Sequence, residues 1–162
     1  MLEEFKFKDE LLSQYIDKPM WFYLLNKFPE IDEDLLEEQL TELVKYLYVG
    51  SCISGPLLVT QELDEIWHAM ILETRAYYDF CKLLPGSKYI HHSSNDYESE
   101  NKIEVDDSAE AEVVFYANYV KEFNGFTDNS ILYWPGALAL KEASGCKTIP
   151  DFNEFLKSIS VQ

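Results

Sequence analysis

Apolar residues recur every three or four positions along most of the chain, which is the spacing that places them on one face of an α-helix. The clearest example follows Asp32, where Leu36, Leu40 and Leu47 share a face while carboxylates fall mostly on the other. We expect this helix to end at Gly50, because glycine readily adopts the left-handed conformation that terminates helices. The same spacing, with its capping and breaking residues, predicts further helices over residues 5–16, 20–28, from about 62 onward, 107–123, 130–144 and 148–158.

Strand patterns are almost absent, so the chain is predicted to be all-α. Its 162 residues suffice for one domain with a substantial core, and no feature of the sequence requires a second domain. We therefore expect residues 1–162 to form a single compact bundle of about six to eight helices. Two stretches without helical spacing are expected to be loops. They are 51–60, which contains Gly55 and Pro56, and the polar stretch 85–106, a long and partly mobile acidic loop.

The charge of the chain is strongly negative. Thirty acidic residues against thirteen basic ones give a formal net charge of −17. The negative electrostatic field of this charge repels phosphate backbones and anionic lipids, which argues against direct binding to nucleic acid or to a membrane. No apolar run is long enough to span a bilayer, and the N-terminal sequence lacks a secretory pattern, so we expect a cytoplasmic location. The three cysteines are widely spaced, which favours reduced thiols.

The carboxylates are concentrated in two blocks. Residues 30–42 hold seven of them with no Lys or Arg, and residues 96–112 hold eight against Lys102 alone. Each block is either a solvated helix face or mobile loop, or a surface that attracts a basic partner with a reach of about 10 Å. Such a partner could be a nucleic-acid-binding protein, whose phosphate-binding groove the carboxylates would occupy as a nucleic-acid mimic. The residues expected to form this docking surface are Glu30, Asp32, Glu33, Asp34, Glu37, Glu38, Glu42, Asp96, Glu98, Glu100, Glu104, Asp106 and Asp107.

All three histidines and one cysteine lie within about thirty residues of one another. Asp64 and His68 are four apart and share a helix face, where a carboxylate can orient an imidazole or both can contact one metal ion. On a straight helix Cys81 would lie about 20 Å beyond His68, so a common site requires a break near Glu73 and a second helix over 75–84. One carboxylate, two imidazoles and a thiolate would suit zinc, although no CxxC or HExxH spacing is present. The candidate ligands are Asp64, His68, Cys81, His91 and His92; the alternative is a hydrogen-bonded His68, a buried Cys81 and surface histidines.

The run ELDEIWHAMILETRAYYDFC, followed by a histidine pair, resembles the core of the glycine-rich-domain-containing-protein-like family, which occurs in plants and as short bacterial proteins. The resemblance covers about thirty residues, and it implies an α-helical domain without an established reaction. Met70 departs from the family pattern, because it stands where the second histidine of Trp-His-x-His is usual. The matching positions are Asp64, Trp67, His68, Ile71, Thr74, Arg75, Tyr78, Cys81, Gly86, His91 and His92.

Two hypotheses for function remain. No glycine-rich phosphate loop or GxSxG motif is present and no carboxylate pair stands out, so no catalytic residue is assigned. The first hypothesis, which the charge favours, is a non-enzymatic inhibitor or adaptor that docks on a basic protein surface and needs no cofactor. The second is a metal- or thiol-dependent enzyme that uses His68, Cys81 and the histidine pair, with zinc as its cofactor.

Overall fold

The computed structural model describes residues 5–53, 59–92 and 109–159, and within these ranges every regular element is a helix. The predicted all-α fold is confirmed, as is the predicted compact bundle of six to eight helices. No helix in the described ranges is long and apolar enough to cross a membrane. In chain order the elements are α1 (Glu10–Tyr15), α2 (Lys18–Lys27), α3 (Glu33–Cys52), α4 (Gln61–Leu72), α5 (Thr74–Leu83), α7 (Ala109–Phe123), the 3₁₀ helix η1 (Ser130–Tyr133), α8 (Pro135–Ala143) and α9 (Ile149–Lys157).

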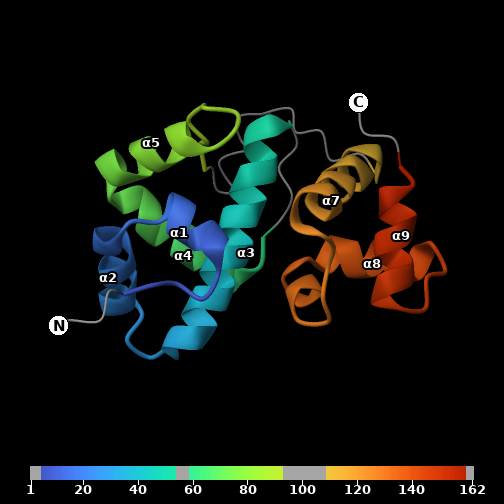
Figure 1. Ribbon diagram of the computed structural model, residues 1–162, viewed down its shortest axis with the longest axis horizontal. Coiled ribbons are helices and arrows are strands. Elements are labelled where there is room, and N and C mark those ends of the chain that lie inside the picture. The colour runs from blue at the N-terminus through green and yellow to red at the C-terminus, as the bar shows by residue number, and fades with distance from the viewer. Residues whose placement is uncertain (1–4, 54–58, 93–108, 160–162) are drawn as a thin grey trace, which may run out of the picture.

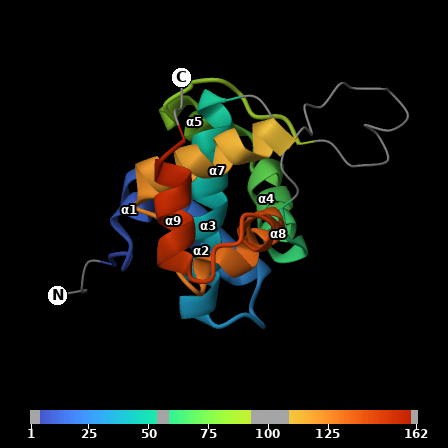
Figure 2. The ribbon, with the colours of Figure 1, turned by 90° about the vertical axis from the view of Figure 1, so that its right-hand side faces the viewer.

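The central element of the molecule is α3, its longest described helix (Figure 1). The helices α1, α2, α4 and α5 gather on one side of α3, and α7, α8 and α9 lie on the other. α3 packs directly against α1, α4 and α7. In turn, α9 packs against α7, and Figure 2 shows α9 in front of α3. α3 therefore lies between the two groups of helices and contacts members of both.

The apolar face of α3 is buried, as its spacing predicts. The helix does not end at Gly50, however, but continues to Cys52. Among the described glycines only Gly125 and Gly145 have positive φ, at 111° and 76°, and they follow α7 and α8. α8 is therefore followed by a left-handed glycine, and α7 by the left-handed Asn124 and then Gly125, whereas α3 ends where Ile53 becomes extended.

The segment before α1 is irregular, in contrast to the helix predicted over residues 5–16. α1 begins only after Asp9, whose side chain caps it by accepting a 2.8 Å hydrogen bond from the backbone N–H of Leu11. Outside the helix, Phe7 is buried with its ring edge-on to Trp21 at a centroid separation of 5.2 Å. The aromatic residues of this segment therefore reach the core without forming a helix.

Proline positions decide where several helices begin. The two helices predicted on either side of Pro19 are present, but α2 begins at Lys18 and includes Pro19 in its first turn, because an N–H in a first turn needs no acceptor within the helix. Pro135 opens α8 in the same way, so the helix predicted over residues 130–144 is divided into η1 and α8. The predicted start near residue 148 is confirmed, since Thr148 caps α9 by accepting from the Asp151 backbone N–H at 3.2 Å.

The predicted loops are described only in part. Of the stretch 85–106, residues 85–92 are irregular, and residues 93–106 lie outside the described residues. Of the stretch 51–60, the first two residues belong to α3, and residues 54–58 lie outside the described residues. Asp107, with which the helix predicted over 107–123 begins, is also outside them.

Candidate functional site

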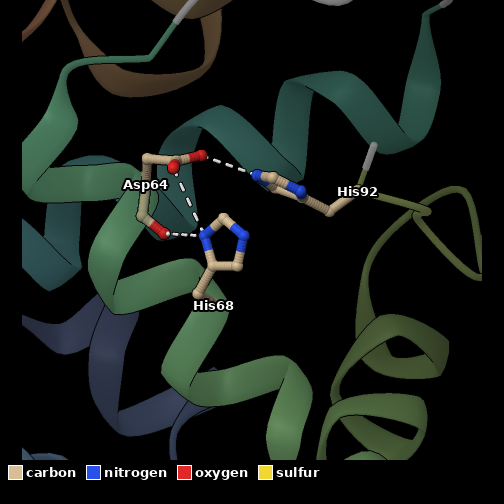
Figure 3. Close-up of side chains that lie close together, drawn as sticks. All are labelled: Asp64, His68 and His92. Carbon is tan, nitrogen blue, oxygen red and sulfur yellow. Dashed lines mark hydrogen bonds and ion pairs between the residues drawn. The ribbon is translucent and has the colours of Figure 1, made fainter. Parts of the chain in front are cut away.

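Asp64, His68 and His92 form a cluster in which one ligand atom from each lies within 4.8 Å of the others (Figure 3). His92 Nε2 is 2.6 Å from Asp64 Oδ1, and His68 Nδ1 is 3.3 Å from Asp64 Oδ2. The two imidazole rings meet edge-on, with centroids 4.2 Å apart. Among the described residues, no other group of His, Cys, Asp and Glu side chains has spacing that suits a metal ion.

Helix α4 positions two members of the cluster. Asp64 lies in its first turn and His68 one turn later, so both project from the same face, as predicted. The helix begins after Thr60, also as predicted, although the Thr60 side chain makes no capping hydrogen bond. The side chains of His68 and Asp64 are 57% and 38% exposed, whereas that of His92 is 12% exposed. The cluster is therefore anchored on one side and open to solvent on the other.

Tyr77 on α5 brings His92 to the cluster. The Tyr77 hydroxyl donates a 2.6 Å hydrogen bond to the Ile90 carbonyl and accepts one of 3.0 Å from Trp67 Nε1. Burial raises the pKa of Tyr77, which keeps this hydroxyl a donor. The Trp67 ring in turn packs edge-on against His92 at a centroid separation of 4.3 Å. These contacts are possible because the chain breaks at Glu73 between α4 and α5, the break that a common site required.

The backbone of α4 selects the tautomer of His68. Its Nδ1 is 2.9 Å from the Asp64 carbonyl oxygen, and Figure 3 shows this contact beside the one to the carboxylate. A carbonyl can only accept a hydrogen bond, so Nδ1 carries the proton. In the neutral ring Nε2 then keeps an unprotonated lone pair, which is the state that binds a metal.

The structure does not bring Cys81 or His91 into the cluster. Cys81 has no exposed surface, and burial raises the pKa of its thiol, which keeps it protonated and unreactive. His91 is exposed, and its ring packs against Tyr89 with centroids 4.7 Å apart. Three of the five predicted ligands thus meet, and the other two do not, because α5 turns Cys81 into the core.

Met70 is buried, and it stands where the family that this segment resembles usually has a second histidine. It has no exposed surface, whereas the His68 side chain is 57% exposed. Residues two apart on an α-helix point about 200° apart, so they cannot contact the same ion from one helix. The methionine therefore removes no ligand from the cluster around Asp64.

Glu42, which the sequence placed on the docking surface, is buried and 3% exposed. Its Oε2 accepts hydrogen bonds from the Tyr119 hydroxyl at 2.9 Å and from Trp134 Nε1 at 2.8 Å. Its Oε1 lies 3.1 Å from Lys45 Nζ. The docking role predicted for Glu42 is therefore corrected to a structural one, because its oxygens hold α7 and the residue between η1 and α8 against α3.

Glu37 is also buried, at 8% exposure. Its Oε1 accepts the backbone N–H of Lys8 at 2.6 Å, with that of Asp9 at 3.4 Å. This carboxylate therefore holds the segment before α1 against α3, and we likewise remove it from the predicted docking surface.

An open groove of about 430 Å³ lies between α3, the segment before α1 and the segment that joins α7 to η1. Lys8 and Asp34 form an ion pair of 2.6 Å here, with side chains 72% and 71% exposed. Glu38 makes no hydrogen bond or ion pair with the described residues. Sequence reasoning missed Lys8 and Asp9, because only the folding of the first segment onto α3 brings them here. The charged lining residues are Asp9, Asp34, Glu37, Glu38 and Glu42, with Lys8 and Lys45.

The remaining predicted docking residues fall into two groups. Glu30, Asp32 and Glu33 are exposed around the start of α3, where Asp32 caps the helix through the backbone N–H of Asp34 at 3.0 Å. The second block lies outside the described residues at Asp96, Glu98, Glu100, Glu104, Asp106 and Asp107.

No protein-family model matches the chain, and no curated protein or solved structure is significantly similar to it. The resemblance of residues 62–92 to a known family therefore stays a prediction.

Proposed function

We propose that this protein is an acidic binding module that docks a basic segment of a partner protein in the groove described above, hereafter the acidic groove. The observation that carries the proposal is the charged lining of the groove, in which Asp9, Asp34 and Glu38 lie beside Lys8. The buried Glu37 and Glu42 also line the groove, but their oxygens already bind groups of this chain. Electrostatic complementarity of this kind speeds association and selects partners of opposite charge. The net charge of −17 supports the same partner class, because the whole molecule attracts cations.

The two lysines do not neutralise the groove. Lys45 pairs with the buried Glu42 and lies over the Tyr119 ring at 5.5 Å, so it belongs to the packing beneath the groove. Lys8 pairs with Asp34, and that hydrogen bond raises the pKa of Lys8. Both side chains of this pair are exposed, and exposed pairs contribute little, so an incoming arginine or lysine can replace Lys8. Such a side chain would meet Asp34 and Glu38 together.

The partner that suits this groove carries clustered lysines and arginines. Basic segments of that composition are common in nucleic-acid-binding proteins, where they contact phosphates. A groove of carboxylates can occupy the same basic surface, so the module would act as an inhibitor or adaptor that mimics nucleic acid. This activity needs neither a cofactor nor a catalytic residue.

The proposal is tested by the binding of a fluorescent peptide of alternating lysine and arginine, measured by anisotropy at low and high salt. The double variant Asp34→Asn with Glu38→Gln removes two groove carboxylates. We expect it to weaken binding by on the order of tenfold, since each exposed charge pair contributes roughly 0.2–1 kcal/mol. The matched control is Asp79→Asn with Glu142→Gln, which changes two exposed carboxylates elsewhere on the surface and gives the same net charge.

Three results decide the proposal. The control variant should lose no more than about twofold in affinity, and the affinity of the wild type should fall steeply with salt. Equal losses in the two variants would show that net charge alone attracts the peptide, and the groove would not be the site. Mimicry predicts that the protein releases the peptide from short duplex DNA, and a ternary complex would contradict it.

A further inference from the structure

We propose that Asp64, His68 and His92 bind one divalent transition-metal ion, Zn²⁺ in the first place, with the remaining coordination position open to water. This site is separate from the acidic groove and does not depend on it. The three residues come from α4 and from the irregular segment that follows α5. They supply two imidazole nitrogens and one carboxylate oxygen, a donor set that zinc and other first-row divalent ions accept.

The spacing of the donor atoms is close to what coordination requires. Zn²⁺ lies about 2.0–2.2 Å from nitrogen and oxygen ligands, which places tetrahedral ligands about 3.3–3.6 Å apart. Here the donor atoms lie within 4.8 Å of one another, and the shortest pair, His92 Nε2 and Asp64 Oδ1, is 2.6 Å apart. Binding would replace this hydrogen bond with two bonds to the ion, and His92 Nε2 would give up the proton that it shares with the carboxylate, either to its own Nδ1 or to solvent. The ion would bind His68 through Nε2, because Nδ1 is protonated, and side-chain rotation of the exposed His68 and the partly exposed Asp64 can bring their donor atoms to it.

The surroundings of the donors are those of a metal-binding histidine pair. His68 directs its Nδ1 proton to the Asp64 carbonyl, which leaves Nε2 unprotonated. His92 is held against Trp67, and its backbone is anchored two residues earlier by the hydrogen bond from Tyr77 to Ile90. The fixed tautomer of His68 and the fixed ring of His92 reduce the ordering cost of binding, because less freedom is lost when the ion arrives.

The open side of the cluster indicates a site with a free position. Structural zinc sites are closed by four protein ligands, whereas sites with three protein ligands keep a water or a substrate in the fourth position. The buried thiol of Cys81, which would have completed a closed site, lies in the core. The ion would therefore carry a solvent-accessible water, and that water would be more acidic than bulk water.

The test is a titration of the untagged chain with ZnCl₂ by calorimetry, with Co²⁺ as a visible spectroscopic probe of the same site. We expect one Zn²⁺ per chain at micromolar concentrations. His68→Ala should weaken binding at least about tenfold, and Asp64→Asn similarly, since each removes one donor. The matched control is His91→Ala, because His91 is an exposed histidine beside the cluster that is not part of it.

Nitrogen-15 NMR of the imidazoles supplies a second measurement that does not depend on the variants. Before zinc is added, His68 should show a protonated Nδ1, and zinc should shift its Nε2 and the His92 resonances but leave His91 unchanged. The far-UV circular dichroism of His68→Ala should match the wild type, because the side chain is exposed. The proposal is overturned if the wild type takes up no zinc, or if His91→Ala weakens binding as much as His68→Ala.

Discussion

The Trp134 indole Nε1 donates a 2.8 Å hydrogen bond to the Glu42 carboxylate, which joins the junction of η1 and α8 to α3 across 92 residues of sequence. The same oxygen accepts from the Tyr119 hydroxyl at 2.9 Å. A carboxylate that looks like one of several surface acids in the sequence is therefore the polar centre of the interface between α3 and the C-terminal helices.

Removal of the Glu42 carboxylate should destabilise the fold strongly. Glu42→Ala leaves the buried donors of Trp134 and Tyr119 without an acceptor and the ammonium of Lys45 without its partner. We expect the free energy of unfolding, measured with urea, to fall by about 4 kcal/mol. The control Glu38→Ala lies one turn earlier on α3 and should change it by no more than about 0.5 kcal/mol. Similar losses in both variants would show that Glu42 is not a structural group.

Two glycines should respond to alanine in opposite directions. A Cβ at Gly86 would lie only 1.8 Å from the backbone oxygen of Ser51, so Gly86→Ala must displace the end of α3 or the turn after α5. We expect a loss of about 1–3 kcal/mol. Gly50 has open space around its Cβ position and lies inside α3, so Gly50→Ala should stabilise the protein by about 0.5–1 kcal/mol. Thermal unfolding of the two variants compares them, and destabilisation by Gly50→Ala would contradict this assignment.

Tyr77 is a positioning residue for His92. Tyr77→Phe removes the hydrogen bond to Ile90 and leaves the buried Trp67 indole N–H unpaired. We expect stability to fall by about 2 kcal/mol and zinc affinity by on the order of tenfold, although Tyr77 donates no ligand. Tyr78→Phe is the control, because Tyr78 is 47% exposed and the loss of its hydroxyl should change neither quantity. Unchanged zinc affinity in folded Tyr77→Phe would show that these hydrogen bonds do not position His92.

Alkaline pH should destabilise the fold through its buried tyrosines. Burial raises the pKa of Tyr77, Tyr116 and Tyr119 above the ordinary value of 10.0. As pH rises past 10, the unfolded chain loses these protons while the folded chain keeps them, so the free energy of unfolding falls. Below pH 10 their contribution is fully present. Urea denaturation at successive pH values measures the fall, and a tyrosinate absorbance titration counts the protected groups. Ionisation of all eleven tyrosines near pH 10 in a folded chain would contradict the prediction.

The three cysteines should differ in reactivity toward iodoacetamide. Cys52 is exposed and Cys146 is partly buried, whereas Cys81 has no exposed surface and a pKa raised by burial. Mass spectrometry after brief labelling at neutral pH should find Cys52 modified first and Cys81 unmodified until urea unfolds the chain. Rapid labelling of Cys81 in the native protein would contradict its placement in the core and revive its role as a nucleophile.

The helical architecture followed from local signals, and these are the signals that a sequence carries well. The face of α3 that contains Leu36 and Leu40 is buried as its spacing predicts, and Thr148 caps α9 where its neighbours indicate. The helix boundaries that were predicted wrongly also rested on local signals. Gly50 looked like a helix end and Phe5 like a helix start, yet packing kept the first inside α3 and the second outside α1.

The sequence by itself determined the all-helical fold, the shared face of Asp64 and His68 and the negative charge, because helical periodicity and composition are properties of neighbouring residues. Only the tertiary structure decided which carboxylates face water. Glu38 and Glu42 stand one turn apart on α3, and what distinguishes them is whether Tyr119 and Trp134 fold over them. Likewise, His92 contacts Asp64 although the two are 28 residues apart, because the Tyr77 hydroxyl binds the Ile90 carbonyl and so holds the segment that carries His92. The spacing of residues along the sequence does not predict this contact.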